Sequence, residues 1–478
     1  MKKPLRTTAG LIAAVLVSGL LATQAVGSTD SLPAASAAVP DCRPITPTPT
    51  PSPTPTPTGT PTATPTATPS TPPTPTPPKT PDNFTPRNGT LTYNNPIGSR
   101  TAQLANTSML VRAINSTPTC EKIQLATWNF RDDKIWWAVR DAVRRGVTVQ
   151  VIMAAGNDAP EGTELFNPRW IRMRDFLAES NATKFDKTQR NWGRTCGGAC
   201  RSAGGAAHSK YYMFSKVGSA RNVVFYGSHN LTYTASDNQW NDLYTVVNDS
   251  YYAFMNRIFT ESAERVRTAN PYRRASFGSL TMDVYAYKGA GRAQGADPMM
   301  TALRRVKCTN AGSVGVSNRT AIRVSMAALL NQRGQDLATK LASLKRSGCN
   351  VKVLVTNIGY HAMKTLQNSR VPLRQLTRYD SRKRKFTIYT HTKVMTISGN
   401  YGGRANQQVA FNGTANWTAS SLDSDELQGE IRSAGIVNKY NYFVNNWYAR
   451  TPMGSKVVPT TVSGVGRSDD PFSEVEGD

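Results

Sequence analysis

The chain has 478 residues, with 57 Lys and Arg residues against 31 Asp and Glu residues, and a formal net charge of +26 at pH 7. Beyond its first 21 residues, no stretch is long and apolar enough to cross a bilayer, which excludes a protein with several membrane spans. The excess positive charge favours an anionic partner: a phospholipid surface, a nucleic acid or a cell-wall polyanion.

The beginning of the chain, residues 1–38, is typical of an export signal peptide. Three basic residues precede an apolar stretch at 11–21 that is too short for a spanning helix, and the sequence Ala-Ser-Ala at 35–37 offers a cleavage site. An uncleaved membrane anchor is the alternative. We therefore predict that the mature protein is soluble, secreted and extracellular.

Two further segments have compositions that do not build a core. Residues 39–84 consist largely of Pro and Thr, which favours a disordered linker with extended polyproline II character. Residues 463–478 are polar and acidic, so we expect a flexible tail. The folded part is expected between them, and it is long enough for two ordinary domains.

Six cysteines in an exported chain predict disulfide bonds, because the compartment outside the cell oxidises thiols. The sequence does not determine the connectivity. Cys196 and Cys200 are close enough to bridge each other, Cys308 with Cys349 is the second pair that we expect, and Cys42 and Cys120 are the two that remain. A zinc site is the alternative for the first pair. It is disfavoured because no His or Cys pair lies nearby to complete it.

Strands and helices alternate in the same order in both halves of the folded part. In the first half, the predicted elements are a strand at 122–128, a helix at 133–145 that ends at Gly146, and a strand at 147–154. In the second half, they are a strand at 321–327, a helix at 335–346 that ends at Gly348, and a strand at 350–356. This order predicts an α/β sheet in each half, and the glycines suit the position after a helix.

A short pattern of polar residues also occurs once in each half. It consists of His-x-Lys, then Gly-[Ser/Thr]-x-Asn, then a carboxylate: His208, Lys210, Gly227 to Asn230 and Asp242, and again His391, Lys393, Gly413 to Asn416 and Glu426. The chain contains only four histidines, and two of them begin this pattern. A single match would be weak evidence, but two copies at similar spacing indicate an internal duplication.

This doubled pattern resembles the phospholipase D superfamily of phosphodiesterases, whose motif is H-x-K-x4-D followed by G-S/G-x-N. The resemblance implies two similar α/β lobes, at residues 85–275 and 276–462, each with a mixed β-sheet flanked by helices and related by a pseudo-twofold axis. The chain departs from the motif at Ser215 and Ser398, where the family has Asp. Since that Asp usually supports the site, we expect the serines to hydrogen-bond in its place.

The residue types suit the chemistry of a phosphodiester. Alternate residues of a strand point to one face, so each His and its Lys would project together. Lysines bind phosphate as point charges, and asparagine amides can donate to the same oxygens. Two half-sites that face each other would form one pocket without a metal ion or other cofactor; its predicted catalytic residues are His208, Lys210, Asn230, His391, Lys393 and Asn416.

An imidazole can attack phosphorus and can also transfer protons near neutral pH. One histidine would form a phosphohistidine while the other protonates the leaving alcohol. The resemblance implies that His208 is the nucleophile and His391 the general acid and base, although the residues themselves leave the two interchangeable. Asp242 and Glu426 are the candidate acceptors that orient the rings, and which carboxylate contacts which ring stays open.

Several neighbouring residues have two possible roles. Ser228 and Thr414 would support the site, either by donating to phosphate or by capping their turns. Trp417 would line the pocket mouth or pack in the core. His229 occupies a variable position of the motif and is expected to be a wall or structural residue, and His361 a surface or packing residue.

The substrate is predicted from the resemblance and from charge. Exported chains with two motif copies resemble phospholipases D, which implies cleavage or headgroup exchange at the distal phosphoester of a glycerophospholipid. The partner would be an anionic or zwitterionic phospholipid at a membrane surface, and we expect a monomer. A nuclease acting on DNA or RNA is the alternative, and an inactive binder of anionic polymers the third. The basic run at 382–385 would attract such a partner or form a solvated loop.

Overall fold

The computed structural model describes residues 81–158, 161, 166–181, 186–287, 297–451 and 457–460. The predicted signal peptide, the predicted tail, Cys42 and nearly all of the predicted linker lie outside these residues and stay predictions. The described residues all belong to one compact unit, so the predicted boundary between two lobes also stays a prediction. None of the helices described is both long and apolar enough to cross a membrane.

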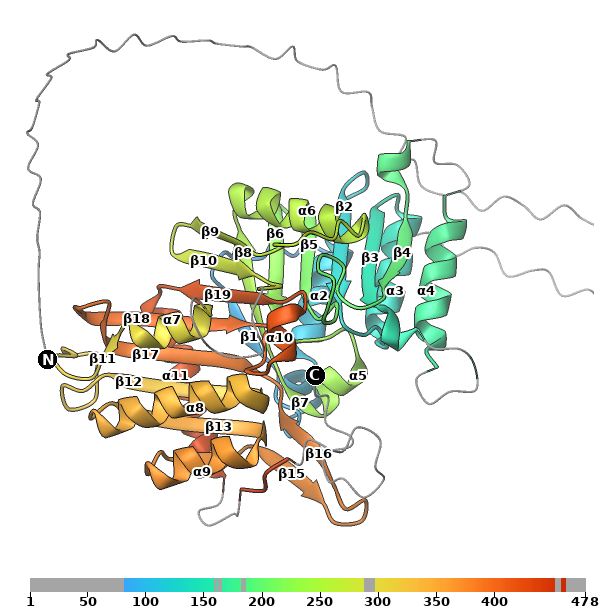
Figure 1. Ribbon diagram of the computed structural model, residues 1–478. Helices are drawn as coiled ribbons and strands as arrows, with labels where there is room; N and C mark the ends of the chain where they lie inside the picture. The colour runs from blue at the N-terminus through green and yellow to red at the C-terminus, as the bar shows by residue number, and fades with distance from the viewer. Residues whose placement is uncertain are drawn as a thin grey trace, which may run out of the picture. The chain divides into compact units, whose positions relative to one another are not determined.

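The first sheet has seven described strands and is built from the first half of the chain (Figure 1). In spatial order, its strands are β1 (Leu91–Tyr93), β8 (Asp242–Val247), β6 (Ala220–Gly227), β5 (Tyr211–Val217), β2 (Lys122–Thr127), β3 (Thr148–Ala154) and β4 (Trp192–Cys196). The strands β2, β3 and β4 are parallel, and the others pair antiparallel.

The second sheet is built from the second half and repeats this order. Along the sheet, its strands are β14 (Leu373–Gln375), β13 (Asn350–Ile358), β12 (Ala321–Leu329), β17 (Lys393–Tyr401), β18 (Arg404–Gly413), β19 (Leu427–Ile431), β10 (Leu280–Val284) and β9 (Arg273–Phe277), with β11 (Val306–Lys307) paired to β17. Again three strands are parallel, β12, β13 and β14. The predicted α/β fold class with two mixed sheets is therefore confirmed.

A third, small sheet joins the two halves. Its strands are β15 (Thr377–Asp380), β16 (Lys385–Thr390) and β7 (Gln239–Trp240). Strand β7 comes from the first half and pairs parallel to β16 from the second. The backbone of one half is thus hydrogen-bonded directly to the backbone of the other, a few residues before His391.

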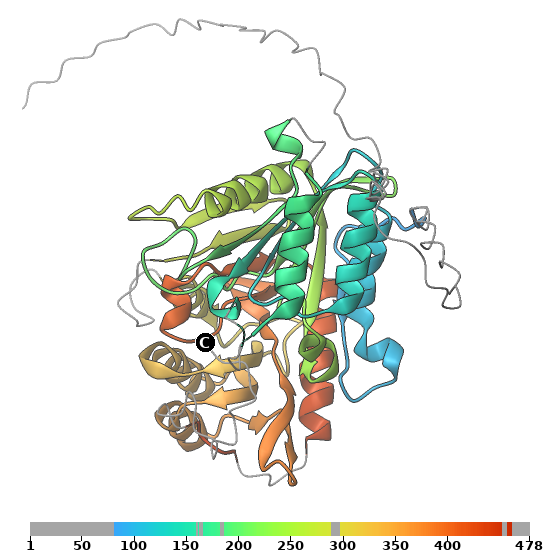
Figure 2. The same cartoon turned by 90° about the vertical axis from the view of Figure 1, so that its right-hand side faces the viewer.

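Helices flank both large sheets. They are α1 (Arg100–Gln103), α2 (Ala105–Asn115), α3 (Asp133–Arg144), α4 (Pro168–Glu179), α5 (Tyr233–Asp237), α6 (Asp249–Ala263), α7 (Pro298–Arg304), α8 (Asn331–Arg346), α9 (Tyr360–Asn368), α10 (Ser420–Asp423) and α11 (Ala434–Arg450). In Figure 2, α3 and α4, in blue-green shades, lie over the first sheet, while α8 and α9 cover the second in Figure 1. The predicted helix at 335–346 begins four residues earlier, at Asn331.

Local sequence explains the two equivalent helices α3 and α8. The carboxylate of Asp132 accepts from the backbone N–H groups of Lys134 and Ile135 and so caps the start of α3. Both helices are followed by a glycine with a left-handed backbone, Gly146 at φ 89° and Gly348 at φ 92°. Glycine adopts this conformation without a Cβ clash, which ends each helix and starts the next parallel strand.

Among the described residues, most of the apolar core forms three layers, and a fourth, smaller cluster includes Trp240 and Trp447. One layer lies between the first sheet and α2, α3 and α4, and another between the second sheet and α7, α8 and α9. The layer between them takes side chains from both sheets, including Met213 and Tyr226 from the first and Val394, Ala410 and Leu427 from the second. Because the halves share this layer, burial of apolar surface holds the two sheets together.

Two of the predicted disulfides are present and confirmed, Cys196–Cys200 and Cys308–Cys349. The first closes the loop that leads to His208. The second connects Cys308, directly after β11, to Cys349, directly before β13. The predicted pairing of Cys42 with Cys120 falls partly outside the described residues.

The glycine that begins each Gly-[Ser/Thr]-x-Asn motif lies where two strands approach closely. A Cβ on Gly227, the last residue of β6, would lie 2.4 Å from the carbonyl oxygen of Asp242. A Cβ on Gly413, the last residue of β18, would lie 2.1 Å from the carbonyl oxygen of Leu427, and its φ is +154°. Both contacts are with backbone, which cannot swing aside, so the motif requires glycine for steric reasons.

We expect Gly227→Ala and Gly413→Ala each to lower the free energy of unfolding by about 1–3 kcal/mol, because the added methyl group overpacks a strand pair. Denaturant unfolding would measure the difference. Gly156→Ala is the matched control, since a Cβ there meets no atom within 4 Å. If the two motif variants were as stable as the control, the strands would be able to move apart at no cost in free energy, and the steric argument would be wrong.

Candidate active site

The first His-x-Lys motif lies at the edge of the first sheet. His208 and Lys210 immediately precede β5, and Asn230 follows the end of β6. Since β5 and β6 are antiparallel, the start of one and the end of the other meet, and the N–H of Gly227 donates to the carbonyl of Lys210 at 3.4 Å. The prediction that the motif lies within a strand is wrong here, because β5 begins at Tyr211, one residue after Lys210.

The second motif has the same position in the second sheet. His391 precedes β17, Lys393 is its first residue, and Asn416 follows the end of β18. The pair β17 and β18 is antiparallel as well. Both halves therefore present His, Lys and Asn at the corresponding sheet edge, as expected from a duplication.

Each His segment is hydrogen-bonded to the other half of the chain. The backbone N–H of His208 donates to the carbonyl of Asp425 at 3.1 Å, and the N–H of His391 donates to the carbonyl of Trp240 at 3.0 Å. These crossed bonds bring the two predicted half-sites together. They also show which residues are equivalent in the two halves. Trp240 is equivalent in position to Asp425, and the residue after each, Asn241 and Glu426, is therefore equivalent as well.

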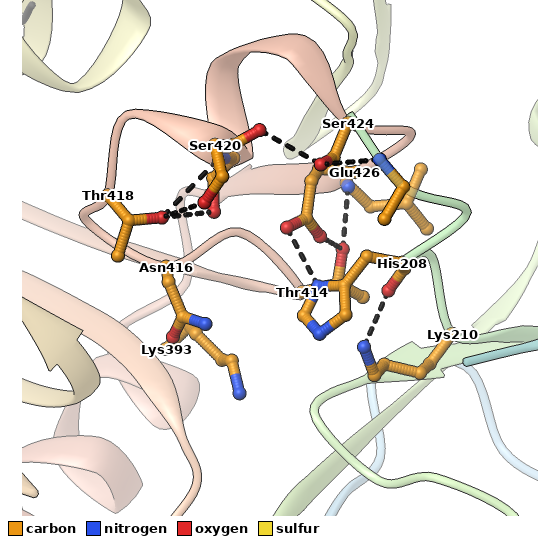
Figure 3. Close-up of polar contacts among 12 residues, drawn as sticks. His208, Lys210, Lys393, Thr414, Asn416, Thr418, Ser420, Ser424 and Glu426 are labelled. Atoms are coloured by element: carbon orange, nitrogen blue, oxygen red, sulfur yellow. Dashed lines mark hydrogen bonds and ion pairs between the residues drawn. The ribbon is translucent and has the colours of Figure 1, made fainter. Parts of the chain in front are cut away.

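The ring of His208 is held by a carboxylate from the second half. Its Nδ1 lies 2.8 Å from Oε1 of Glu426, and a carboxylate can only accept, so Nδ1 carries the proton (Figure 3). The other oxygen, Oε2, accepts from the hydroxyl of Thr414 at 2.5 Å. The His208 side chain is nearly buried and Glu426 is fully buried. This arrangement sets the tautomer that leaves Nε2 as the reactive nitrogen.

The ring of His391 is held by neutral acceptors from the first half. Its Nδ1 lies 2.8 Å from Oδ1 of Asn241 and 3.1 Å from the carbonyl oxygen of Ser228. The amide nitrogen of Asn241 donates to the carbonyl of Ala235 and to Oε1 of Gln239, both at 3.0 Å, which fixes its oxygen toward the ring. Nδ1 of His391 therefore also carries a proton.

The prediction that Asp242 orients a histidine at this nitrogen is wrong. Asp242 is one residue beyond Asn241, so its side chain leaves β8 in another direction. Its Oδ1 accepts from the N–H and hydroxyl of Ser228, and its Oδ2 accepts from Tyr440 at 2.7 Å and Asn412 at 3.3 Å. Asp242 thus supports the Ser228 turn and connects it to the second half.

The two lysines lie in equivalent, buried positions. Nζ of Lys210 donates to the carbonyl of His208 at 2.6 Å, and Nζ of Lys393 donates to that of His391 at 2.8 Å. Burial, followed by the charges of Lys393, Lys210 and His208, holds the pKa of His391 well below its usual value. In Figure 3 the ring of His208 lies between Lys210 and the pair Lys393 and Asn416. The two motifs thus converge in one basic site.

Buried groups fix the loops that carry the two asparagines. The hydroxyl of Tyr212 donates to the carbonyl of His229, next to Asn230, at 2.5 Å. In the second half, the buried guanidinium of Arg333 donates to the carbonyl of Asn416 at 2.8 Å and pairs with Asp297 at 2.8 Å. Both asparagines are almost completely buried, and these bonds hold the backbone that carries them.

The structure distinguishes between the two roles that the sequence allowed for several residues near the site. Ser228 and Thr414 use their hydroxyls to donate to Asp242 and Glu426, which supports the turn-capping role. His229 is buried against Thr107, and burial lowers its pKa to about 3, so this ring is neutral and structural. Trp417 packs in the core, and His361 is exposed.

The serines at the position of the family's Asp do hydrogen-bond, as expected. Ser215 donates to Glu121 at 2.7 Å, and its oxygen accepts from the N–H of Lys122 at 2.7 Å. Ser398 accepts from the amide of Asn441 at 3.2 Å. Both contacts join a strand of the sheet to its neighbouring elements.

Sequence reasoning missed three residues of the site. Asn241 is the most important of them, and its position in the sequence could have indicated it. It follows Asn230 by 11 positions, which is close to the 10 positions between Asn416 and Glu426 in the second half. The rings of Trp128 and His208 pack edge to face with their centroids 5.4 Å apart. The rings of Tyr389 and His391 also pack edge to face, with their centroids 6.4 Å apart. No sequence pattern distinguishes these aromatic residues from core residues.

Across the described ranges, no group of three or more His, Cys, Asp and Glu side chains is arranged to hold a metal ion. The acidic residues near the site instead orient histidine and serine. The positive charge at the site comes from Lys210 and Lys393.

The solved structures to which this chain is similar share little sequence with it. Phosphatidylserine synthase of Haemophilus influenzae is 11% identical, with 76% of this chain and 89% of that one covered and a TM-score of 0.48. Polyphosphate kinase of Porphyromonas gingivalis is 12% identical, covering 75% of this chain at a TM-score of 0.47, and this chain spans half of its length. Nuc of Salmonella typhimurium, a phospholipase D family member, is 18% identical, covering 37% and 93% at a TM-score of 0.26. A search of the curated proteins found no match.

The model of one protein family, described as "Cardiolipin synthase, PLD-like domain", matches residues 110–262 and again residues 317–447. The two matched segments together make up more than half of the chain, and each holds one of the His-x-Lys motifs and the asparagine that follows it. On this match, the chain belongs to the phospholipase D superfamily of phosphodiesterases.

Proposed function

We propose that the protein is an exported phosphodiesterase that cleaves the distal phosphoester of glycerophospholipids through a phosphohistidine intermediate. Water as acceptor gives phosphatidate, and an alcohol gives a new phospholipid by transphosphatidylation. One observation carries the proposal: the two halves bring His208, Lys210, His391 and Lys393 into one buried site. Two rings and two ammonium groups suit a reaction at a single phosphorus atom.

The geometry supports a division of labour among these groups. Both rings carry a proton on Nδ1, so both present Nε2 for reaction. One Nε2 attacks phosphorus while the other protonates the departing alcohol. The ammonium groups of Lys210 and Lys393 would hold the two free oxygens of the phosphodiester, where negative charge must be stabilised while the bond changes.

A basic hairpin next to the site supports an anionic surface as partner. The turn between β15 and β16 exposes residues 382–384 of the basic run, Lys385 begins β16 and is half-buried, and Tyr379 on β15 is 49% exposed. Strand β16 runs from this turn to Thr390, directly before His391, a length of roughly 20 Å at the usual rise of a strand. Basic residues with an aromatic residue suit the headgroup region of an anionic membrane.

A nuclease is the second candidate, and the net charge of +26 favours it. Phosphodiesters of nucleic acids and of lipids present the same two free oxygens to the site. The two candidates therefore differ in what binds around the phosphate and not in the reaction at phosphorus. An assay of one protein preparation on both kinds of substrate distinguishes the two candidates.

Purified protein is expected to release choline from phosphatidylcholine vesicles that contain an anionic lipid, and to leave plasmid DNA intact. Both substrates would be tested in the same buffer, with choline release and the loss of supercoiled DNA as readouts. Nicking without choline release would support the nuclease. Tight binding to either substrate without turnover would support the inactive binder.

Replacement of either histidine should abolish turnover. We expect His208→Ala and His391→Ala to lower kcat by about 10²–10⁴-fold or more, since each removes a group that bonds to phosphorus or transfers the proton. His361→Ala, at an exposed histidine outside the site, is the matched control. A motif variant with the activity of this control would contradict a site shared by the two halves.

Activity should persist in EDTA, because two lysines supply the positive charge that a metal ion provides in other phosphodiesterases. Turnover would be compared after dialysis against EDTA and after addition of Ca²⁺ or Mg²⁺. Strict dependence on a divalent ion would overturn this expectation.

A further inference from the structure

The two histidines of the site are preceded by different kinds of structure. Strand β16 ends one residue before His391, and at that end it pairs with β7 of the other half. The segment before His208 is the loop 197–207. In the described part of the chain, that loop forms one isolated β-bridge, between Ala207 and Asp425, and no strand. The backbone of the first histidine therefore depends on other contacts for its position.

The loop 197–207 follows a path that only glycine tolerates at two places. Gly198 and Gly205 have left-handed backbones, with φ of 72° and 70°. A Cβ on Gly205 would also lie 2.4 Å from the carbonyl oxygen of Asp423, so the loop lies directly against the segment before β19. Because glycine loses more conformational freedom on folding than any other residue, such a loop needs constraints to hold one position.

The residue that connects this loop to the site is Asp425. Its Oδ2 accepts from the backbone N–H of Cys200 at 2.5 Å. Its own N–H donates to the carbonyl of Ala206 at 2.9 Å, and its carbonyl accepts from the N–H of His208 at 3.1 Å. One residue thus contacts both ends of the loop, next to the Cys196–Cys200 disulfide and next to the histidine.

Stability does not explain a carboxylate at this position. Burial raises the pKa of Asp425 to about 6, although the N–H of Cys200 and the charge of Arg201 favour the ionised form. The pKa of an Asp in an unfolded chain is lower. The folded state therefore loses stability as the pH rises from that lower value through about 6. A buried acid that lowers stability beside a reactive group is a candidate for a role in the reaction.

The disulfide next to Asp425 is also better explained by position than by stability. A crosslink stabilises a protein mainly by restricting the unfolded chain, and this effect grows with the length of the closed loop. Cys196 and Cys200 are four positions apart, whereas Cys308 and Cys349 are 41 positions apart. The short crosslink thus contributes less stability than the long one. Its direct consequence is to fix the N–H of Cys200.

We infer that the Cys196–Cys200 disulfide and Asp425 position His208 for the reaction. The disulfide fixes Cys200, whose N–H holds the Asp425 carboxylate. The backbone of Asp425 in turn holds the segment of His208, and the next residue, Glu426, contacts the Nδ1 of the ring at 2.8 Å. Asp425 is a positioning residue that acts through the histidine. The inference rests on the proposed function, because it assigns His208 a part in that reaction.

Turnover of bis(p-nitrophenyl) phosphate tests this role without a choice between lipid and nucleic acid. We expect Cys196→Ala/Cys200→Ala and Asp425→Ala each to lower kcat by about 10–10²-fold, the effect of displacing a reacting group by roughly 1 Å. KM should change by less than about threefold, since neither variant removes a group that binds substrate. Asp425→Asn keeps an oxygen that can accept from Cys200, so it is expected to retain most of the wild-type kcat.

Cys308→Ala/Cys349→Ala is the matched control, because it removes the other disulfide. It should lower the melting temperature more than Cys196→Ala/Cys200→Ala does and leave kcat unchanged. A purely structural role for the short disulfide predicts the opposite: kcat would fall in proportion to the loss of stability in both double variants. That result, or an equal loss of kcat in Asp425→Asn and Asp425→Ala, overturns the inference.

Hydrogen exchange measures the position of the segment independently of any reaction. The N–H groups of His208 and Asp425 are bonded across the two segments, and their exchange is followed by mass spectrometry of the peptides that contain them. Exchange should become about tenfold faster or more in Cys196→Ala/Cys200→Ala and in Asp425→Ala, and stay at the wild-type rate in the control. Unchanged exchange in the first two variants overturns the inference.

Failure of the proposed function gives a different result. If the wild type hydrolyses no phosphodiester, the proposed function is wrong. Faster exchange in the two variants would then still establish that the disulfide and Asp425 hold the His208 segment.

Discussion

The site depends on two crossed backbone hydrogen bonds. Each one connects the segment that carries a histidine to the segment just before β19 or β8 in the other half, His208 to Asp425 and His391 to Trp240. A backbone bond sets the position of the chain more firmly than a side-chain contact, because few torsions intervene. Once these two bonds form, the side chain after each acceptor faces the opposite ring. The catalytic geometry is thus a consequence of how the halves pair.

The apolar layer between the two sheets supplies the driving force for this pairing. Met213 and Tyr226 from one sheet pack with Val394 and Leu427 from the other, and polar bonds cross the same boundary, such as Tyr226 to Asn412 at 3.0 Å. Lys210 and Lys393 are also buried. Taking an ammonium group out of water costs several kcal/mol, and a phosphodiester between the two groups offsets part of this cost when it binds. The site is therefore organised for an anion before the substrate arrives.

Duplication of the fold did not preserve the charge at every equivalent position. The order of the strands, the glycines at the strand ends and the lysine contacts repeat in both halves. The partners of the two rings differ, Glu426 for one and Asn241 for the other. The strand order is therefore repeated in the two halves, while the charge of these two ring partners is not.

The sequence by itself determined the α/β class, the order of elements in each half and the six residues proposed for catalysis, and it suggested two cysteine pairs that the structure then confirmed. These features are local or periodic: alternation of strands and helices, a glycine after a helix, and a His-x-Lys pattern that occurs twice. Only the tertiary structure decided which side chain meets which ring, and it placed Asn241 where Asp242 was expected. The reason is that a strand sends successive side chains in different directions, so a shift of one residue changes the partner. That shift depends on the pairing of two segments about 150 residues apart, which no local pattern encodes.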